Sequence, residues 1–141
     1  MTDASGSSSS CGDASQSNAS PHLNLLVLRA AELRATAAFY EALGFAFTTE
    51  RHGQGPEHLA SIATETSPLV LELYPASCSV DTQAVRLGFR VPNLTSALER
   101  ITAAGGTIVT APRTSPRGRK AVVADPDGRR VELLEFGRQA S

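Results

Sequence analysis

The chain has 141 residues, a typical length for one domain, and its 13 Lys and Arg residues nearly balance 14 Asp and Glu residues, for a net charge of -1. This balance provides no basic surface for nucleic acid or an anionic membrane, and with no Trp and few aromatics the chain offers no platform for stacking bases. No apolar run approaches the ~20 residues of a membrane-spanning helix. The two cysteines, Cys11 and Cys78, form no disulfide framework, so we expect a reducing, cytoplasmic location.

The first 20 residues differ in composition from the rest of the chain. They contain eight Ser, together with Gly, Asp, Asn and Gln, and almost nothing that could be buried. Such a segment does not offset the entropy lost on ordering, so we expect residues 1–21 to form a disordered Ser-rich tail. The tail has neither a basic start nor an apolar stretch, so it does not resemble a secretory signal. We expect a single domain at residues 22–138.

The first half of this domain is predicted to contain a strand, a helix and three more strands. Residues 23–29 are apolar enough for a strand, and apolar residues at helical spacing predict a helix over 32–43. Gly44 is expected to end this helix in the left-handed conformation. The three further strands are predicted at 45–50, 58–63 and 69–74, with a glycine-rich loop at 51–56.

The second half is predicted to repeat this order. A strand at 85–91 is followed by Asn93, a suitable N-cap for a helix over 94–104, which Gly105 is expected to end. Strands are predicted at 107–110, 120–124 and 130–136, with a loop at 111–118 and a turn at 125–128.

Four residue pairs support an internal repeat. Three pairs are 61 positions apart and the fourth is 60 apart: Arg29 and Arg90, Leu33 and Leu94, Gly44 and Gly105, and Glu72 and Glu132. Identical residues in the same order of elements predict an α+β fold of two βαβββ modules, at residues 23–75 and 84–136. In each helix one apolar stripe should face the core, and Leu33, Phe39, Leu98 and Ile101 are predicted core residues.

The pattern resembles the vicinal oxygen chelate superfamily, which includes glyoxalase I, bleomycin-resistance proteins, fosfomycin-resistance proteins and extradiol dioxygenases. The segments that carry the resemblance are FYEALGF at 39–45, LGFRV at 87–91 and DPDGRRVEL at 125–133. The resemblance implies the glyoxalase/bleomycin-resistance fold, in which curved mixed sheets form a cup that is usually closed in a homodimer. The resemblance therefore implies a homodimer. We also expect a small-molecule ligand as a partner, and neither a nucleic acid nor a membrane.

The resemblance also implies metal ligands on the first and last strand of each module. Those positions are Leu25, Glu72, Arg86 and Glu132 in this sequence. Leu25 has no ligating atom, and Arg86 has only hydrogen-bond donors and a permanent positive charge. We therefore expect no metal cofactor, and a divalent metal stays a minor alternative with Glu72, Glu132 and His58 as its candidate ligands.

Strand alternation predicts which side chains line the cup. Leu71 and Leu73 should pack under the first helix, which turns Glu72 toward the cup. In the strand at 85–91, Leu87 and Phe89 should be buried, which turns Arg86 and Arg90 toward the cup. The candidate ligand-binding residues are Arg29, His58, Glu72, Arg86, Arg90 and Glu132. No catalytic residue is assigned.

Two of these predictions leave alternatives open. Arg86 either forms an ion pair with Glu132 or, like Arg90, holds an anionic group of a ligand. His58 either faces the cup, as a third metal ligand or a general base, or is an ordinary residue at the start of a strand. The other histidines, His22 and His52, are less favoured as functional residues.

Three functions remain open at this point. We favour a glyoxalase/bleomycin-resistance-like protein that binds a small molecule in a charged cup without the usual metal. The first alternative is a metal-dependent enzyme, a lyase or isomerase of glyoxalase I type or a dioxygenase-like protein. The second is a non-enzymatic dimer module.

Overall fold

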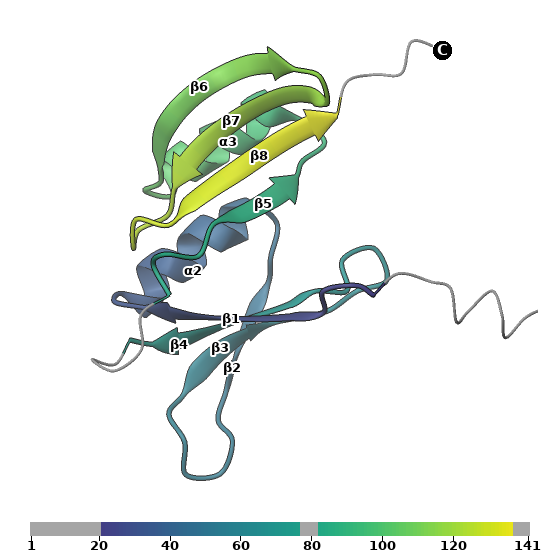
Figure 1. Cartoon of the computed structure of the whole chain (residues 1–141). Helices are drawn as coiled ribbons and strands as arrows, with labels where there is room; N and C mark the ends of the chain where they lie inside the picture. Colours follow the sequence, from purple (N-terminus) through teal and green to yellow (C-terminus); the bar gives the residue numbers. More distant parts are fainter. Residues whose placement is uncertain (1–20, 77–81, 137–141) are drawn as a thin grey trace, which may run out of the picture.

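The computed structural model describes residues 21–76 and 82–136, and within them the chain forms two four-stranded mixed sheets and two helices (Figure 1). The first module contains β1 (Leu25–Ala30), α2 (Leu33–Ala42), β2 (Phe47–Glu50), β3 (His58–Ser61) and β4 (Val70–Pro75). The second contains β5 (Leu87–Arg90), α3 (Leu94–Ala103), β6 (Thr107–Ser115), β7 (Gly118–Ala124) and β8 (Arg130–Phe136). The expectations for residues 1–20, including Cys11, for Cys78 and for residues 137–138 lie outside the described residues.

The two modules have the same topology, which confirms the predicted α+β fold of two βαβββ units. The first sheet has the order β1-β4-β3-β2, and the second has the equivalent order β5-β8-β7-β6. In each module the first and last strands are parallel neighbours, so Val27 pairs with Glu72 and Gly88 pairs with Glu132. The repeat seen in the sequence therefore corresponds to equivalent places in the two sheets.

Local signals set the ends of the helices. Asn93 caps α3 by accepting a 2.9 Å hydrogen bond from the Ser96 amide, as predicted. Gly44 and Gly105 follow the two helices with φ of 116° and 97°, in the left-handed region where a side chain would be strained. None of the helices in the described ranges is long and apolar enough to cross a membrane.

The predicted loop at 111–118 was wrong. β6 continues to Ser115 and β7 begins at Gly118, with Arg113 paired to Lys120. Pro112 lies where the β6–β7 register shifts, and β6 is an edge strand. An edge strand tolerates a residue without an amide hydrogen, because one side of the strand needs no ladder hydrogen bond.

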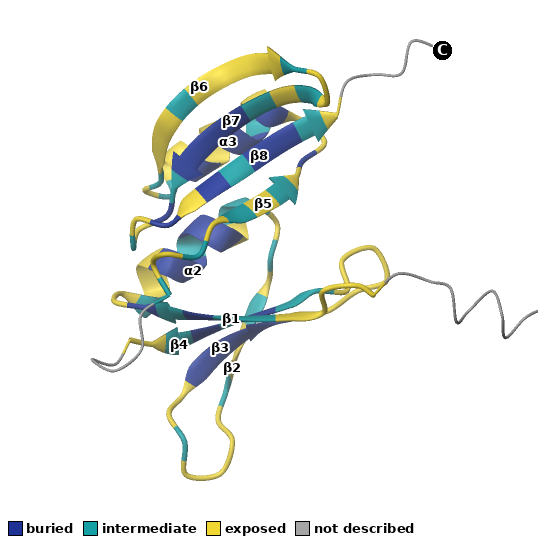
Figure 2. Cartoon of the chain, in the orientation of Figure 1, coloured by how far each residue is buried: buried dark blue, intermediate teal, exposed yellow. Residues whose placement is uncertain are grey.

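Each helix covers one face of its own sheet, and the core lies beneath it (Figure 2). Leu71, Leu73, Phe39 and Ile101 are fully buried and Leu98 is 8% exposed, whereas Leu33 is only partly buried against this core. The alternate side chains of β1, β4 and β5 are more exposed and define an open face on each sheet, which confirms the predicted strand alternation.

The modules are joined by aromatic packing and by a buried polar network. Tyr40 and Phe45 of the first module lie 6.4 Å and 5.7 Å from the Phe89 ring of the second, centroid to centroid. The predicted turn at 125–128 is present, closed by a hydrogen bond from the Gly128 amide to the Asp125 carbonyl. Arg129, directly after it, is completely buried.

Candidate functional site

A basic pocket lies on the open face of the second sheet. β5 and β8 run parallel, and their register sets Gly88 beside Glu132 and Arg90 beside Leu134. These strands border a cavity of about 270 Å³, which we call the β5–β8 pocket. It is lined by Gly88, Phe89, Arg90, Arg117, Glu132 and Leu134.

Among the described residues that line this pocket, Glu132 is the only acidic one, and two cations approach it. Arg86 Nη2 is 3.8 Å and Lys120 Nζ is 3.9 Å from Glu132 Oε1. Arg86 is 60% exposed, so its contact with Glu132 is a loose ion pair of small net stabilisation. The expected Arg86–Glu132 pair is thus present as a single long contact.

The other two arginines at the pocket lie against an aromatic ring. The Arg90 guanidinium carbon is 3.8 Å from the centroid of the Phe136 ring, and that of Arg117 is 5.9 Å from the same ring. In the described part of the chain, neither guanidinium forms an ion pair with a carboxylate. The surroundings of the pocket therefore have more positive than negative charge, and their donors are available to an anion.

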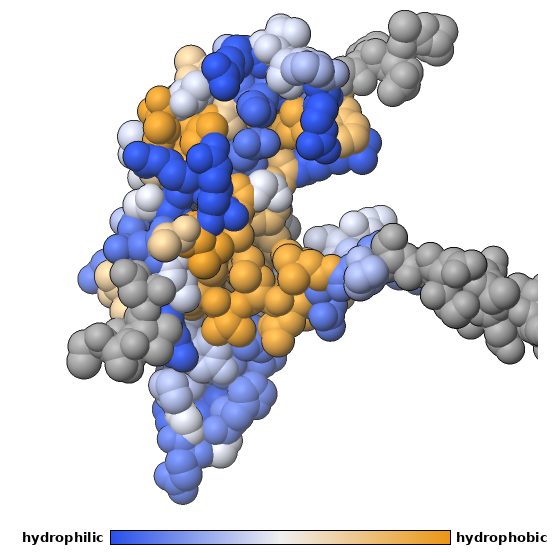
Figure 3. Space-filling view, in the orientation of Figure 1, coloured by the Kyte–Doolittle hydropathy of each residue, from blue (hydrophilic) through white to orange (hydrophobic). Residues whose placement is uncertain are grey.

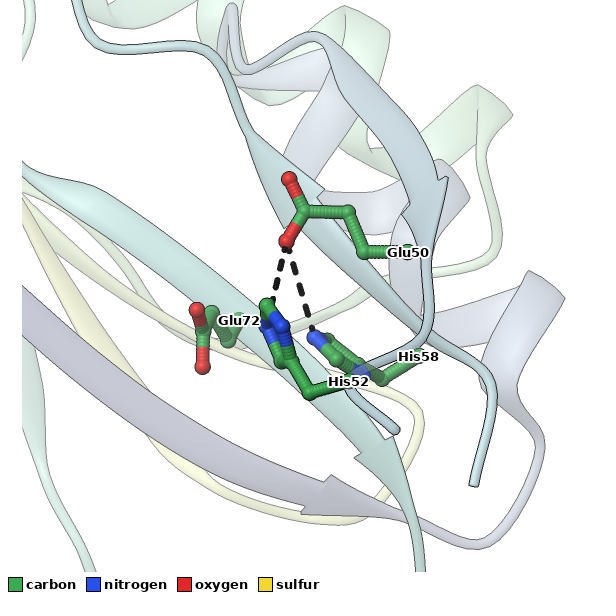
Figure 4. Close-up of side chains that lie close together, drawn as sticks. All are labelled: Glu50, His52, His58 and Glu72. Carbon is green, nitrogen blue, oxygen red and sulfur yellow. Dashed lines mark ion pairs between the residues drawn. The ribbon is translucent and has the colours of Figure 1, made fainter. Parts of the chain in front are cut away.

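A second group of titratable side chains lies on the open face of the first sheet (Figure 4). Glu50, His52, His58 and Glu72 each offer one ligand atom, and these atoms lie within 4.8 Å of one another. Glu50 ends β2 and pairs with His58, the first residue of β3, across the hairpin. His52 comes from the connecting loop and Glu72 from β4.

The six residues predicted for one cup fall into two groups. Arg29, His58 and Glu72 belong to the first sheet, where the Arg29 guanidinium lies 4.9 Å from the Tyr74 ring. Arg86, Arg90 and Glu132 belong to the second module. Across the described ranges, no ion pair or hydrogen bond links a side chain of one group to a side chain of the other.

The sequence analysis did not consider Glu50, gave His52 little weight, and missed Lys120 and Arg117. The signal for the first two was the spacing of Glu50, His52 and His58 around a predicted hairpin, which brings a strand end, its loop and the next strand together. His22 is exposed and lies outside both groups.

A groove of about 550 Å³ lies elsewhere, between α3 and β6. In the part of the chain that the structure describes, it is lined by Thr95, Leu98, Glu99, Thr102, Ala103, Ile108 and Pro112, of which Glu99 is the only charged residue. The groove therefore lacks the convergent polar groups that orient a ligand, and we place the candidate site at the β5–β8 pocket.

Comparison with known proteins agrees with the fold. A model of the glyoxalase-like domain matches residues 25–134, which span both modules. The chain belongs to the glyoxalase-like domain family. A comparison with curated proteins found no match.

Three solved structures illustrate the likeness of this glyoxalase-like domain to its superfamily. TnmS3, an antibiotic binding protein from Streptomyces sp. CB03234, is 22% identical with a TM-score of 0.67, over 84% of this chain and 98% of that chain. A glyoxalase-related enzyme from Fulvimarina pelagi is 24% identical with a TM-score of 0.63, over 82% and 88%. A glyoxalase/bleomycin resistance protein from Streptomyces sp. CB03234 is 22% identical with a TM-score of 0.63, over 81% and 100%. At sequence identities of 22–24%, the likeness to these structures shows that the fold is shared and nothing more.

The glyoxalase-like domain does not keep a metal-ligand set at the positions that its superfamily implies. Leu25 is 48% exposed and has no donor atom. Figure 3 shows that hydrophobic residues gather on the surface of the first module over β1. Arg86 places a cation beside Glu132, where a metal would need an electron-pair donor. A divalent ion at these positions would have only carboxylates as ligands. These residues therefore do not fit the metal ion that the superfamily resemblance implies.

Proposed function

We propose that this glyoxalase-like domain binds a small anionic molecule in the β5–β8 pocket, without a metal at the superfamily position. The observation that carries the proposal is that Arg90 and Arg117 line this pocket and that neither has a carboxylate partner among the described residues. In addition, Arg86 stands beside Glu132 at a position where the superfamily places a metal ligand. A carboxylate or phosphate accepts hydrogen bonds from such guanidinium groups in paired geometry.

The pocket supplies both affinity and orientation. The Phe136 ring under Arg90 holds the guanidinium plane at 3.8 Å and so orients its donors. Phe89 and Leu134 add apolar contact, and Glu132 offers an acceptor to a donor group of the ligand. The volume of about 270 Å³ lies just below the ~300–1,000 Å³ of ordinary ligand sites, which favours a small ligand or one that extends out of the pocket.

The fold neighbours are compatible with this proposal. TnmS3 is an antibiotic binding protein that shares this architecture. A shared fold hosts many functions, so the support for ligand class comes from the arginines and not from the likeness. We further propose that the protein acts in the cytoplasm. We also propose that it is a homodimer, because the open sheet faces and edge strands of one chain leave surface that a second copy would cover.

A panel of small carboxylates, phosphates and neutral isosteres tests the proposal in chelator-containing buffer. We expect anionic compounds to raise the thermal midpoint of the wild type, and we expect titration calorimetry to show affinity about ten-fold or more weaker in Arg90→Ala and Arg117→Ala. Arg34→Ala, which removes an exposed arginine of α2, is the matched control and should bind as the wild type does. Anion binding that survives in the Arg90→Ala/Arg117→Ala double variant, or a preference for the neutral isosteres, would contradict it. No binding to any compound would favour the dimer module.

A further inference from the structure

We propose that Glu50, His52, His58 and Glu72 form a site for a divalent transition metal, with Zn²⁺ as its best-fitting ion. The site lies on the open face of the first sheet and is independent of the β5–β8 pocket. It shares only Glu72 with the positions that the superfamily resemblance assigned to metal ligands, and its other three residues come from the β2–β3 hairpin. It would overturn the expectation of no metal cofactor, and it contains two of the three ligands of the metal alternative, His58 and Glu72.

The hairpin positions three of the four donors. Antiparallel pairing sets Glu50 opposite His58. The loop between them is closed by a 2.9 Å hydrogen bond from the Gly55 amide to the His52 carbonyl, with Gly53 at φ 58°. This turn returns the chain over the hairpin, so that the His52 ring centroid lies 5.0 Å from that of His58.

The unpartnered ring nitrogen of the buried His58 is the observation that most favours a metal. His58 is 1% exposed, and its ring is stacked on Tyr74 at 4.1 Å. Its Nδ1 lies 3.3 Å from the Pro56 carbonyl oxygen, which can only accept, so Nδ1 carries the hydrogen. In the neutral ring Nε2 then carries a lone pair, and Nε2 is buried with no hydrogen-bond partner among the described residues.

That lone pair is directed at a carboxylate. His58 Nε2 is 3.7 Å from Glu50 Oε1, and His52 Nε2 is 3.6 Å from the same oxygen (Figure 4). Two acceptors that face each other at this distance repel unless a positive charge lies between them. A metal ion supplies this charge, and a histidine that donates its other ring hydrogen to a backbone carbonyl is the usual arrangement in metal sites.

The distances and the ligand types also fit a metal. Ligands about 2.0–2.1 Å from a tetrahedral zinc lie about 3.4 Å apart, close to the two Glu50–histidine separations. Two imidazoles and two carboxylates are a donor set that zinc and its neighbours accept, whereas carboxylates alone favour harder ions. Four protein donors complete a tetrahedral sphere, as in structural zinc sites. The ion would therefore cross-link the β2–β3 hairpin to β4.

A proton on His58 is the competing explanation, and it makes a different prediction. Protonated His58 would form an ion pair with Glu50 alone, and neither His52 nor Glu72 would be needed. The two explanations are separated by variants of His52 and Glu72. His52 is 69% exposed, so His52→Ala should fold normally, whereas replacement of the buried His58 risks unfolding the hairpin.

The test uses the full chain without a histidine tag, stripped with chelator and titrated with Zn²⁺ by calorimetry and with Co²⁺ by absorption spectroscopy. We expect one equivalent of Zn²⁺ per chain, a raised thermal midpoint, and Co²⁺ bands of tetrahedral coordination. Affinity should fall about ten-fold or more in His52→Ala and in Glu72→Gln. His22→Ala and Glu132→Gln, at an exposed histidine and at the glutamate of the other module, should bind Zn²⁺ as the wild type does.

The proposal fails if the wild type shows no stoichiometric Zn²⁺ binding, or if His52→Ala and Glu72→Gln bind as tightly as the wild type. Glu50→Gln separates the explanations further, because loss of a His58–Glu50 ion pair would lower the thermal midpoint equally with and without Zn²⁺. Under the metal proposal, the Glu50→Gln variant instead loses most of the increase that Zn²⁺ causes in the wild type.

Discussion

The Tyr40 hydroxyl donates a 2.7 Å hydrogen bond to Asp125 Oδ2, and this bond joins helix α2 of the first module to the β7–β8 turn of the second. The same carboxylate oxygen accepts a 2.6 Å hydrogen bond from Arg129 Nη1. Arg129 also donates to the Thr82 carbonyl at 2.9 Å and to the Arg29 carbonyl. The turn of the second module is thereby fixed to the first module and to residue 82 between them.

We expect Arg129→Ala to be among the most destabilising single substitutions. Arg129 and Asp125 are both fully buried, and loss of one partner leaves an unpaired charge in the core, which costs about 3–5 kcal/mol of unfolding free energy. Chemical denaturation measures this loss. Arg130→Ala, which removes the exposed arginine next in sequence, should change stability by about 0.5 kcal/mol or less. Equal effects of the two substitutions would show that the network does not hold the modules together.

Tyr40 should make stability depend on pH in the alkaline range. Burial, and then the charge of Asp125, raises the pKa of Tyr40 well above its usual value. Above pH about 10 the unfolded chain releases the Tyr40 proton while the folded chain keeps it, so the unfolding free energy falls as pH rises. We expect Tyr40→Phe to be less stable than the wild type at neutral pH by about 1–2 kcal/mol. The variant should also lack the fall in unfolding free energy above pH about 10 that Tyr40 causes in the wild type. The gap between the two proteins should narrow with rising pH; a constant gap would contradict the prediction.

Leu98→Ala should destabilise the second module through its core. Leu98 is 8% exposed on the buried stripe of α3, and removing such a side chain costs about 2–5 kcal/mol. Ile62→Ala is the matched control, since Ile62 is 56% exposed and its replacement should cost about 0.5 kcal/mol or less. Thermal or denaturant unfolding compares them, and an unchanged midpoint for Leu98→Ala would show that the α3 stripe has been assigned wrongly.

The homodimer proposal predicts a sedimenting species of twice the chain's 14.8 kDa. Edge strands β1 and β5, with Leu25 exposed on the open face of the first sheet, present surface that pairing would cover. Sedimentation equilibrium at micromolar concentration measures the mass. A single 14.8 kDa species across the whole concentration range would refute the dimer.

Except for the loop expected at 111–118, local patterns were enough to predict the elements and the faces of the strands. Helices begin and end where capping and glycine signals placed them, as at Asn93 and Gly105, because these signals act within a few residues. The alternation of Leu71, Glu72 and Leu73 determined which side chains are buried, since neighbours on a strand point to opposite faces. The repeat then extended each assignment from one module to the other.

The sequence by itself determined the two βαβββ modules and the outward position of Glu72, Arg86 and Arg90. Only the tertiary structure decided which charged side chains meet. Glu50 and His52 join His58 and Glu72 because three strands and one loop converge there, and no local pattern encodes this convergence. No pattern in the sequence singled out Arg129, which directly follows the turn at 125–128, yet it is buried because its partners come from β1, residue 82 and the turn itself. A charged side chain can be buried only where all its partners are assembled, and that assembly depends on contacts distant in sequence.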